Sequence, residues 1–182
     1  TNINRSKPAF VLNPEDERNA FLNERGEVID TNKRVVQLDL MRRDNPIGLI
    51  NWFGVHPTII GPTQPTVSSD MKGFASLGFE QVMGTDYLPA AGEDNFVAAF
   101  AQADEGDSSP NILIEEFPHP DPRRGGGVDD FDSNAISGIK QLAKAMELFQ
   151  QGEAVTGPVD YRLLHIPINN ITVDDPVVLN RL

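Results

Sequence analysis

A histidine that ends a hydrophobic segment is the first residue of this chain whose type and position suit chemistry. His56 closes the apolar run of residues 47–56, and Pro57 then interrupts strand pairing. Strand ends hold a side chain rigidly where it can face a crevice, and neutral imidazole is a common zinc ligand. His56 is therefore a candidate metal ligand, and the alternative is a core histidine whose ring is hydrogen-bonded to a backbone carbonyl.

A serine in the loop after another apolar segment is the second candidate. Residues 96–101 predict a short strand, and the loop that follows carries Ser109 within the sequence Gly-Asp-Ser-Ser-Pro-Asn of residues 106–111. A serine presented on such a loop could act as a nucleophile or hold a polar group of a substrate. The alternative is a turn in which the hydroxyl satisfies the backbone of its own loop.

A third segment, residues 67–76, joins a loop to the start of a predicted helix. Free N–H groups at a helix start could bind an anion or an oxyanion. Capping of the helix by Asp70 explains most of the segment without any ligand.

Two strands precede these sites and are expected to position them. Residues 35–41 alternate, with Val36, Leu38 and Leu40 on one face of the strand. Residues 47–56 are apolar on both faces, which is typical of a central strand covered by a layer on each side. The short turn between the two strands predicts an antiparallel hairpin.

Helical patterns cover residues 71–83 and about residues 134–151, the second capped by Asp132 or Ser133. The second helix has an apolar face that we expect to be buried, formed by Ile136, Ile139, Ala143 and Met146. Residues 161–168 predict a last strand. This mixed order predicts an α/β or α+β layered domain with a mixed β-sheet and flanking helices, and residues 1–182 are expected to form a single domain.

The charge of the chain argues against a nucleic-acid partner. Its 27 acidic residues against 15 basic ones give a net charge of −12, whereas phosphate binding needs a positive face. The chain has no cysteine, which excludes disulfides and thiolate metal sites.

Taken in order along the chain, four groups of residues resemble motifs of the neutral (non-lysosomal, neutral/alkaline) ceramidase family. These are Asn4-Arg5-Ser6 with Asn13 to Arg18, Trp52 to His56, Ser68 to Ser76, and Phe96 to Gln102 with Gly106 to Asn111. The resemblance extends through nearly the whole chain. The sequence departs from the family pattern at Ile59-Ile60, Met71 and Asp104-Glu105.

The resemblance implies a zinc-dependent amide hydrolase that cleaves the N-acyl bond of ceramide to sphingosine and a fatty acid. In that family two histidines, a glutamate and a tyrosine bind zinc, and His56 matches the second histidine. Ser109 matches the serine that the family needs for activity. The other zinc ligands would lie outside this chain, so it resembles an interior part of an N-terminal catalytic domain and is expected to be inactive alone.

Two other functions stay open. One is a non-catalytic, ceramidase-like lipid-binding or scaffold domain, and the other is a serine amidase in which Ser109 uses a local base such as His119. Within the first hypothesis, Ser109 either attacks the amide or positions a water that does so, and the lack of a convincing base favours the second role.

The partners and the compartment follow from the same resemblance. The expected partners are ceramide or a related N-acyl sphingoid lipid and the remainder of the same enzyme, with peripheral contact at a membrane surface. The expected location is secreted or extracellular, or periplasmic or cell-surface in a bacterium, with a signal peptide outside this chain.

Overall fold

The structure is a computed structural model, and it describes residues 31–89, 95–106, 108–112 and 125–165, with isolated positions at 14, 16, 22, 25–26, 29, 167 and 172. The chain divides into two units, Thr1–Gly152 and Glu153–Leu182. The single domain expected for residues 1–182 stays a prediction. No helix among the described residues is long and apolar enough to cross a membrane.

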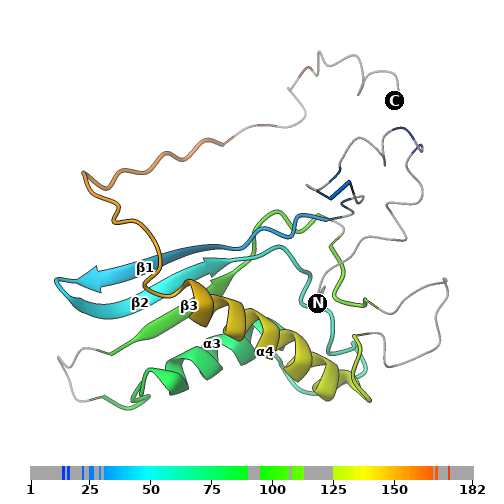
Figure 1. The fold of residues 1–182 in the computed structure, drawn as a ribbon. Helices are drawn as coiled ribbons and strands as arrows, with labels where there is room; N and C mark the ends of the chain where they lie inside the picture. The colour runs from blue at the N-terminus through cyan, green and yellow to red at the C-terminus, as the bar shows by residue number, and fades with distance from the viewer. Residues whose placement is uncertain are drawn as a thin grey trace. The chain divides into compact units, whose positions relative to one another are not determined.

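The first unit contains a three-stranded mixed sheet (Figure 1). Strand β1 (Val36–Arg42) pairs antiparallel with β2 (Asn45–Trp52), which confirms the hairpin. Strand β3 (Val97–Ala101) lies on the other side of β2 and runs parallel to it. The carboxyl ends of β2 and β3 therefore lie at the same edge of the sheet.

Two helices form the second layer of this unit. Helix α3 (Asp70–Val82) connects β2 to β3, and helix α4 (Asp130–Leu148) follows later in the chain. Figure 1 shows both helices on the same face of the sheet. Apolar side chains from β2, α3, α4 and the start of β3 form the core between the layers, which confirms a mixed sheet with flanking helices.

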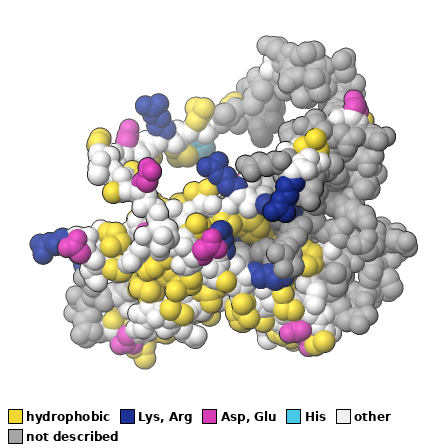
Figure 2. Space-filling model, in the orientation of Figure 1, with side chains coloured by type: hydrophobic (Ala, Val, Ile, Leu, Met, Phe, Trp, Pro, Cys, Tyr) yellow, Lys and Arg dark blue, Asp and Glu magenta, His cyan; other side chains and the backbone are white. Residues whose placement is uncertain are grey.

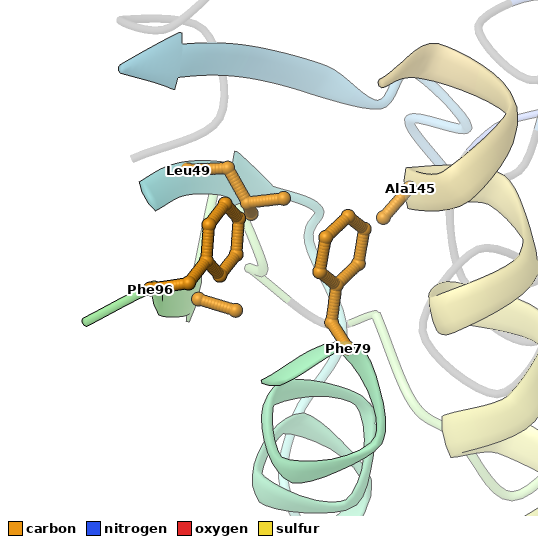
Figure 3. Packing of buried hydrophobic residues seen from close by; sticks show 5 residues of the cluster. Leu49, Phe79, Phe96 and Ala145 are labelled. Atoms are coloured by element: carbon orange, nitrogen blue, oxygen red, sulfur yellow. The ribbon is translucent and has the colours of Figure 1, made fainter. Parts of the chain in front are cut away.

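Aromatic rings fill the centre of this core. The Phe79 ring stacks on Phe96 with their centroids 5.6 Å apart, and it meets the edge of Phe149 at 5.3 Å. Figure 3 shows Phe79 and Phe96 between Leu49 of β2 and Ala145 of α4. This packing joins the helices to the middle of the sheet.

The two faces of the sheet differ. On the face toward the helices, Gln37 donates to the carbonyl of Ala145, and Asn51 donates to Gln37. The apolar residues of the opposite face stay 39–60% exposed at Val36, Leu38, Leu40 and Val97. The described helices thus cover β2 on one face, and the second layer expected on its other face stays a prediction.

Helix α4 differs from its sequence prediction in start and orientation. It begins at Asp130, because Asp129 accepts a hydrogen bond from the Asp132 N–H at 2.8 Å and so caps it earlier than expected. Its buried residues are small or polar (Ser133, Ser137, Gly138, Gln141 and Ala145), whereas the predicted apolar face is largely exposed. Small residues let the helices approach closely, and a Cβ on Gly138 would lie 2.5 Å from the Phe74 ring.

Side chains from α3 and the residues after it cover part of the outer edge of β3. The Ser76 hydroxyl donates to the carbonyl of Ala98 at 2.6 Å, and the Ala98 N–H donates to Glu80 at 3.0 Å. The Thr85 hydroxyl donates to the carbonyl of Phe96 at 2.9 Å. These bonds occupy backbone groups that a further strand would otherwise use.

The described residues of the second unit contain neither a helix nor a strand. The strand predicted for residues 161–168 is therefore wrong over residues 161–165, where Tyr161 and Leu163 are largely exposed. A strand needs a hydrogen-bonded neighbour, which alternation in the sequence cannot supply. The Asn4-Arg5-Ser6 motif, Asp107 and His119 lie outside the described residues.

Candidate active site

Both candidate residues follow the carboxyl ends of adjacent parallel strands. His56 comes four residues after the end of β2, and Ser109 comes eight residues after the end of β3. A small apolar cluster of Phe53, Val55 and Ile59 with Met71 anchors the segment that carries His56. Parallel pairing of β2 with β3 therefore brings the two segments to the same edge of the sheet.

His56 lies directly against the loop that carries Ser109. The His56 backbone N–H donates to the carbonyl of Ser108 at 2.9 Å. The imidazole Nε2 lies 2.6 Å from the carbonyl oxygen of Gly106, and Nδ1 lies 3.6 Å from the Glu105 carboxylate. The structure thus brings the two sequence-predicted residues together, although the role of each stays a prediction.

Glu105 offers a carboxylate oxygen that has no hydrogen-bond partner. Its Oε2 is buried, receives no hydrogen bond in the structure and is the atom that faces the Nδ1 of His56. Buried polar atoms are ordinarily paired, so this oxygen favours a donor or a cation beside the ring. In the sequence, Glu105 differs from the family pattern, and no role was predicted for it.

These side chains have the chemistry of zinc ligands but are too few to form a site. His56 and Glu105 supply one imidazole and one carboxylate, whereas zinc sites use at least three protein ligands. The described residues contain no group of three or more His, Cys, Asp or Glu that could hold a metal ion. A zinc site that uses His56 needs ligands from outside the described part of the chain.

Ser109 forms a turn with its own loop. Its Oγ accepts a hydrogen bond from the Asn111 N–H at 3.1 Å, while Ser108 and Pro110 on either side are buried. This bond matches the turn considered as the alternative to a catalytic role, and it leaves the hydroxyl proton free for donation. Among the described residues, no carboxylate and no imidazole is hydrogen-bonded to this hydroxyl.

Gln102 is a residue of this site that ends one of the sequence motifs but for which the sequence predicted no role. Its side-chain oxygen accepts from the Val55 N–H at 3.1 Å, and its side-chain nitrogen donates to the Val55 carbonyl at 2.6 Å. One amide side chain therefore satisfies both backbone groups of the residue directly before His56.

Lys72 is the second residue that lies within a sequence motif but for which the sequence predicted no role. Its ammonium is buried, and it donates to the carbonyls of Phe53 at 2.7 Å and Ala101 at 3.0 Å. It also lies 5.5 Å from the centroid of the Phe53 ring. Burial lowers the pKa of Lys72 from 10.5 to about 8, and the negative charge of Glu105 opposes part of that shift.

Two carboxylates at helix starts hold the loop that follows His56. The Ile60 N–H donates to Asp70 and the Gly61 N–H donates to Asp130, both at 2.9 Å. Asp70 does not cap α3 as predicted: Ser69 occupies the cap position without a side-chain hydrogen bond, and Asp70 is the first helical residue, with a φ of 53°. Its carboxylate accepts from the Ile60 N–H of the loop at one oxygen and from the Met71 N–H in the first turn of α3, at 2.8 Å, at the other.

Asn32, which precedes β1, also holds the residue before Glu105. The Asn32 side chain donates to both carboxylate oxygens of Asp104, at 3.1 and 3.0 Å, and thereby lowers the pKa of Asp104. A Cβ on Gly54 would lie 2.5 Å from the carbonyl oxygen of Asp104, so the segments after β2 and β3 approach more closely than a side chain at position 54 would allow.

A separate apolar groove lies between the two helices. Its volume is about 560 Å³, and it is lined by Phe74, Leu77, Gly78, Gln81, Val82 and Leu142. Figure 2 shows hydrophobic side chains gathered over the region of α3 and α4. None of these lining residues belongs to the loops of His56 and Ser109.

Comparison with known proteins identifies the relatives of the chain. A protein-family model described as "Neutral/alkaline non-lysosomal ceramidase, N-terminal" matches residues 1–180. Neutral ceramidase B of Dictyostelium discoideum is 36% identical over 97% of this chain and 26% of its own length. Neutral ceramidase of Mycobacterium tuberculosis is 32% identical over 94% of this chain and 25% of its own length.

A solved structure gives the same result. The crystal structure of neutral ceramidase from Pseudomonas aeruginosa is similar to this fold with a TM-score of 0.55 and 28% sequence identity. The similarity covers 81% of this chain and 20% of that protein. The chain therefore spans about a quarter of the length of its curated relatives.

Proposed function

The chain belongs to the neutral/alkaline non-lysosomal ceramidase family, and from that membership we propose that it is part of a zinc-dependent amide hydrolase acting on ceramide. The reaction adds water across the N-acyl bond and releases a fatty acid and sphingosine. One observation carries the proposal, which is that His56 is held against the Ser109 loop at the ends of two parallel strands.

In this proposal His56 is one of the zinc ligands, and the remaining ligands come from outside the described residues. When bound, zinc would polarise the amide carbonyl and lower the pKa of a water molecule. The Nδ1 of His56 already faces the Glu105 carboxylate, whereas the Nε2 would have to leave the Gly106 carbonyl before it could bind a metal.

Ser109 acts in this proposal as a group that positions the reactants. Its oxygen accepts from the Asn111 N–H, so its proton is available to a substrate carbonyl or to the attacking water. An attack by Ser109 itself would need a general base within hydrogen-bond reach. The recorded hydrogen bonds of the described residues supply no such base, which favours attack by water.

The proposal extends to where the enzyme acts. A substrate with two hydrocarbon chains resides in a bilayer, so the enzyme would contact a membrane surface without spanning it. We propose that it works outside the cytoplasm, which is the location expected from the family resemblance.

The decisive experiment uses the complete enzyme with ceramide, rapid quench and mass spectrometry. We expect Ser109→Ala to lower kcat by about 100-fold or more, and Thr156→Ala, which removes a hydroxyl at an exposed position of the second unit, to lower it by less than about threefold. An acyl group trapped on Ser109 would reject attack by water. An undiminished rate in Ser109→Ala would reject both roles of the serine.

The same experiment tests the alternative function. A complete wild-type protein that binds ceramide vesicles but releases no fatty acid would be a ceramidase-like binding or scaffold protein. In that case, zinc-loaded wild type would show no turnover at any protein concentration.

A further inference from the structure

The segments after β2 and β3 stay together although strand pairing has ended. The ladder stops at Trp52 and Ala101, and the next backbone hydrogen bond, from the Phe53 N–H to the Ala101 carbonyl, is long at 3.4 Å. The next link between these backbones is the bond from His56 to Ser108. Something other than the sheet must therefore hold the segments in between.

Gln102 bridges this interval in the way that a strand would. A primary amide carries one acceptor and two donors in one plane, so it can pair with both groups of one peptide residue. Gln102 does so at Val55, with bonds of 3.1 and 2.6 Å. Because Val55 immediately precedes His56, this pairing fixes the backbone from which the imidazole projects.

Lys72 connects the same two segments at residues that precede Val55 and Gln102 in the chain. Its ammonium donates to the Phe53 carbonyl after β2 and to the Ala101 carbonyl that ends β3. Its side chain is buried beside these two carbonyls, and Lys72 is only 8% exposed. Loss of the ammonium would leave two carbonyls without this donor at the point where the strands end.

We infer that Gln102 and Lys72 are positioning residues that set His56 against the Ser109 loop. The inference rests on the proposed function, because it assigns these residues to the same site. Neither side chain has a recorded bond to the His56 ring or the Ser109 hydroxyl, so each acts through the backbone. A 1 Å displacement of a reacting group can cost about 100-fold in rate, which sets the size of the expected effect.

The test uses Gln102→Met in the complete, zinc-loaded enzyme. Methionine keeps the length of the side chain and removes both hydrogen bonds to Val55. We expect kcat to fall about 10- to 100-fold and KM to change less than about threefold, because substrate binding is not the step affected. Gln81→Met makes the same change at an exposed position of α3 and should leave both constants within about twofold.

Lys72→Met provides an independent test of the same inference. It removes the ammonium from the Phe53 and Ala101 carbonyls, and we expect the same separation of kcat from KM. Lys144→Met, which removes an exposed ammonium that pairs with Glu147, is its control. An unchanged kcat in both Gln102→Met and Lys72→Met would overturn the inference.

Hydrogen exchange separates this inference from the proposed function. In Gln102→Met, the amides of Val55 and His56 should exchange about tenfold faster or more, while those of β1 keep their wild-type rates. A wild-type enzyme without ceramide turnover would reject the proposed function, and the exchange result would then decide the positioning role alone. If amide exchange became faster by the same factor across β1, β2 and α3, the variant would be generally destabilised, and this result would overturn the positioning role of Gln102.

Discussion

Two regions of the sheet differ in what surrounds them. The carboxyl ends of β2 and β3 are held by hydrogen bonds from neighbouring residues, whereas the open face of the sheet exposes apolar side chains. At the strand ends, Gln102 and Lys72 bind backbone groups and His56 binds the neighbouring loop. On the open face, apolar side chains such as Val36 and Val97 stay 43% and 60% exposed. The first region is held by bonds that the described residues supply, whereas the second has no described cover.

This difference indicates which properties belong to the chain and which depend on its surroundings. The backbone geometry around His56 is determined by contacts within about 60 residues of sequence, so it should persist in any form that folds. The apolar face gains stability only when another layer removes it from water. The predictions below test both halves of this contrast.

The largest effect is expected at the strand ends, from His56→Ala in the complete enzyme. Loss of one imidazole from a zinc site should remove bound zinc and lower kcat/KM about 1000-fold or more. Metal analysis and a ceramide assay measure the two losses. His165→Ala, a change in the exposed second unit, should leave both within about twofold; a His56→Ala enzyme with full zinc and turnover would contradict the ligand role.

The next effect concerns the buried charge of Lys72 and its pH dependence. The folded-state pKa of about 8 lies below the ordinary 10.5, so between these pH values the unfolded chain binds more protons. Stability of the wild type relative to Lys72→Met should therefore rise between about pH 8 and 10.5, by up to about 3 kcal/mol. Urea unfolding at several pH values measures this difference.

The groups that face the Lys72 ammonium determine the direction of its pKa shift. Glu105 is the carboxylate that opposes the shift, and the two carbonyls and the Phe53 ring face the ammonium from the other elements. A stability difference that falls as pH rises would mean that the charged form is favoured in the folded chain. Lys144→Met, which removes an exposed ammonium on α4, is measured beside it as the matched control.

A smaller effect is expected on the covered face of the sheet, from Asn51→Ala. Asn51 is 1% exposed and donates to Gln37, which in turn donates to the carbonyl of Ala145 in α4. Breaking this chain leaves the Gln37 oxygen without that donor and should lower the free energy of unfolding by about 2 kcal/mol. Asn45→Ala, at the exposed start of β2, should lower it by less than about 0.5 kcal/mol.

The smallest effect is expected on the open face, from Val97→Thr. The change keeps a β-branched side chain and adds a hydroxyl, so in the 182-residue chain it should alter stability by less than about 0.5 kcal/mol. In the complete enzyme the same change should cost about 1 kcal/mol or more, because a covering layer would bury the hydroxyl. Equal costs in the two contexts would show that the face stays open.

The sequence predicted the three strands of the sheet but not which of their faces is covered, and it also predicted a strand at residues 161–168 that is absent over residues 161–165. Alternation placed Val36, Leu38 and Leu40 together, and the structure leaves them on the exposed face. Alternation reports a period and carries no information about the side on which α3 and α4 pack. In α4 the residues of the predicted apolar face (Ile136, Ile139, Ala143 and Met146) are likewise largely exposed, because Gly138 and its small neighbours allow the closest approach to α3.

For the site, the sequence identified the residues that could react but not those that hold them in place. His56 and Ser109 stood out because each follows an apolar segment in a motif of recognisable composition. Gln102 and Lys72 act through side chain–backbone bonds, which leave no periodic signal. The available signals were a glutamine that directly ends a strand of small apolar residues and a lysine beside Met71 at a helix start.

The bonds along β3 have a consequence for how the sheet could grow. Because Ser76, Glu80 and Thr85 occupy donors and acceptors of Phe96 and Ala98, a strand arriving at that side would find them already taken. Addition of a strand beside this part of β3 would first have to break these three side-chain bonds. Continuation of the sheet by more polypeptide should therefore be disfavoured at Phe96 and Ala98.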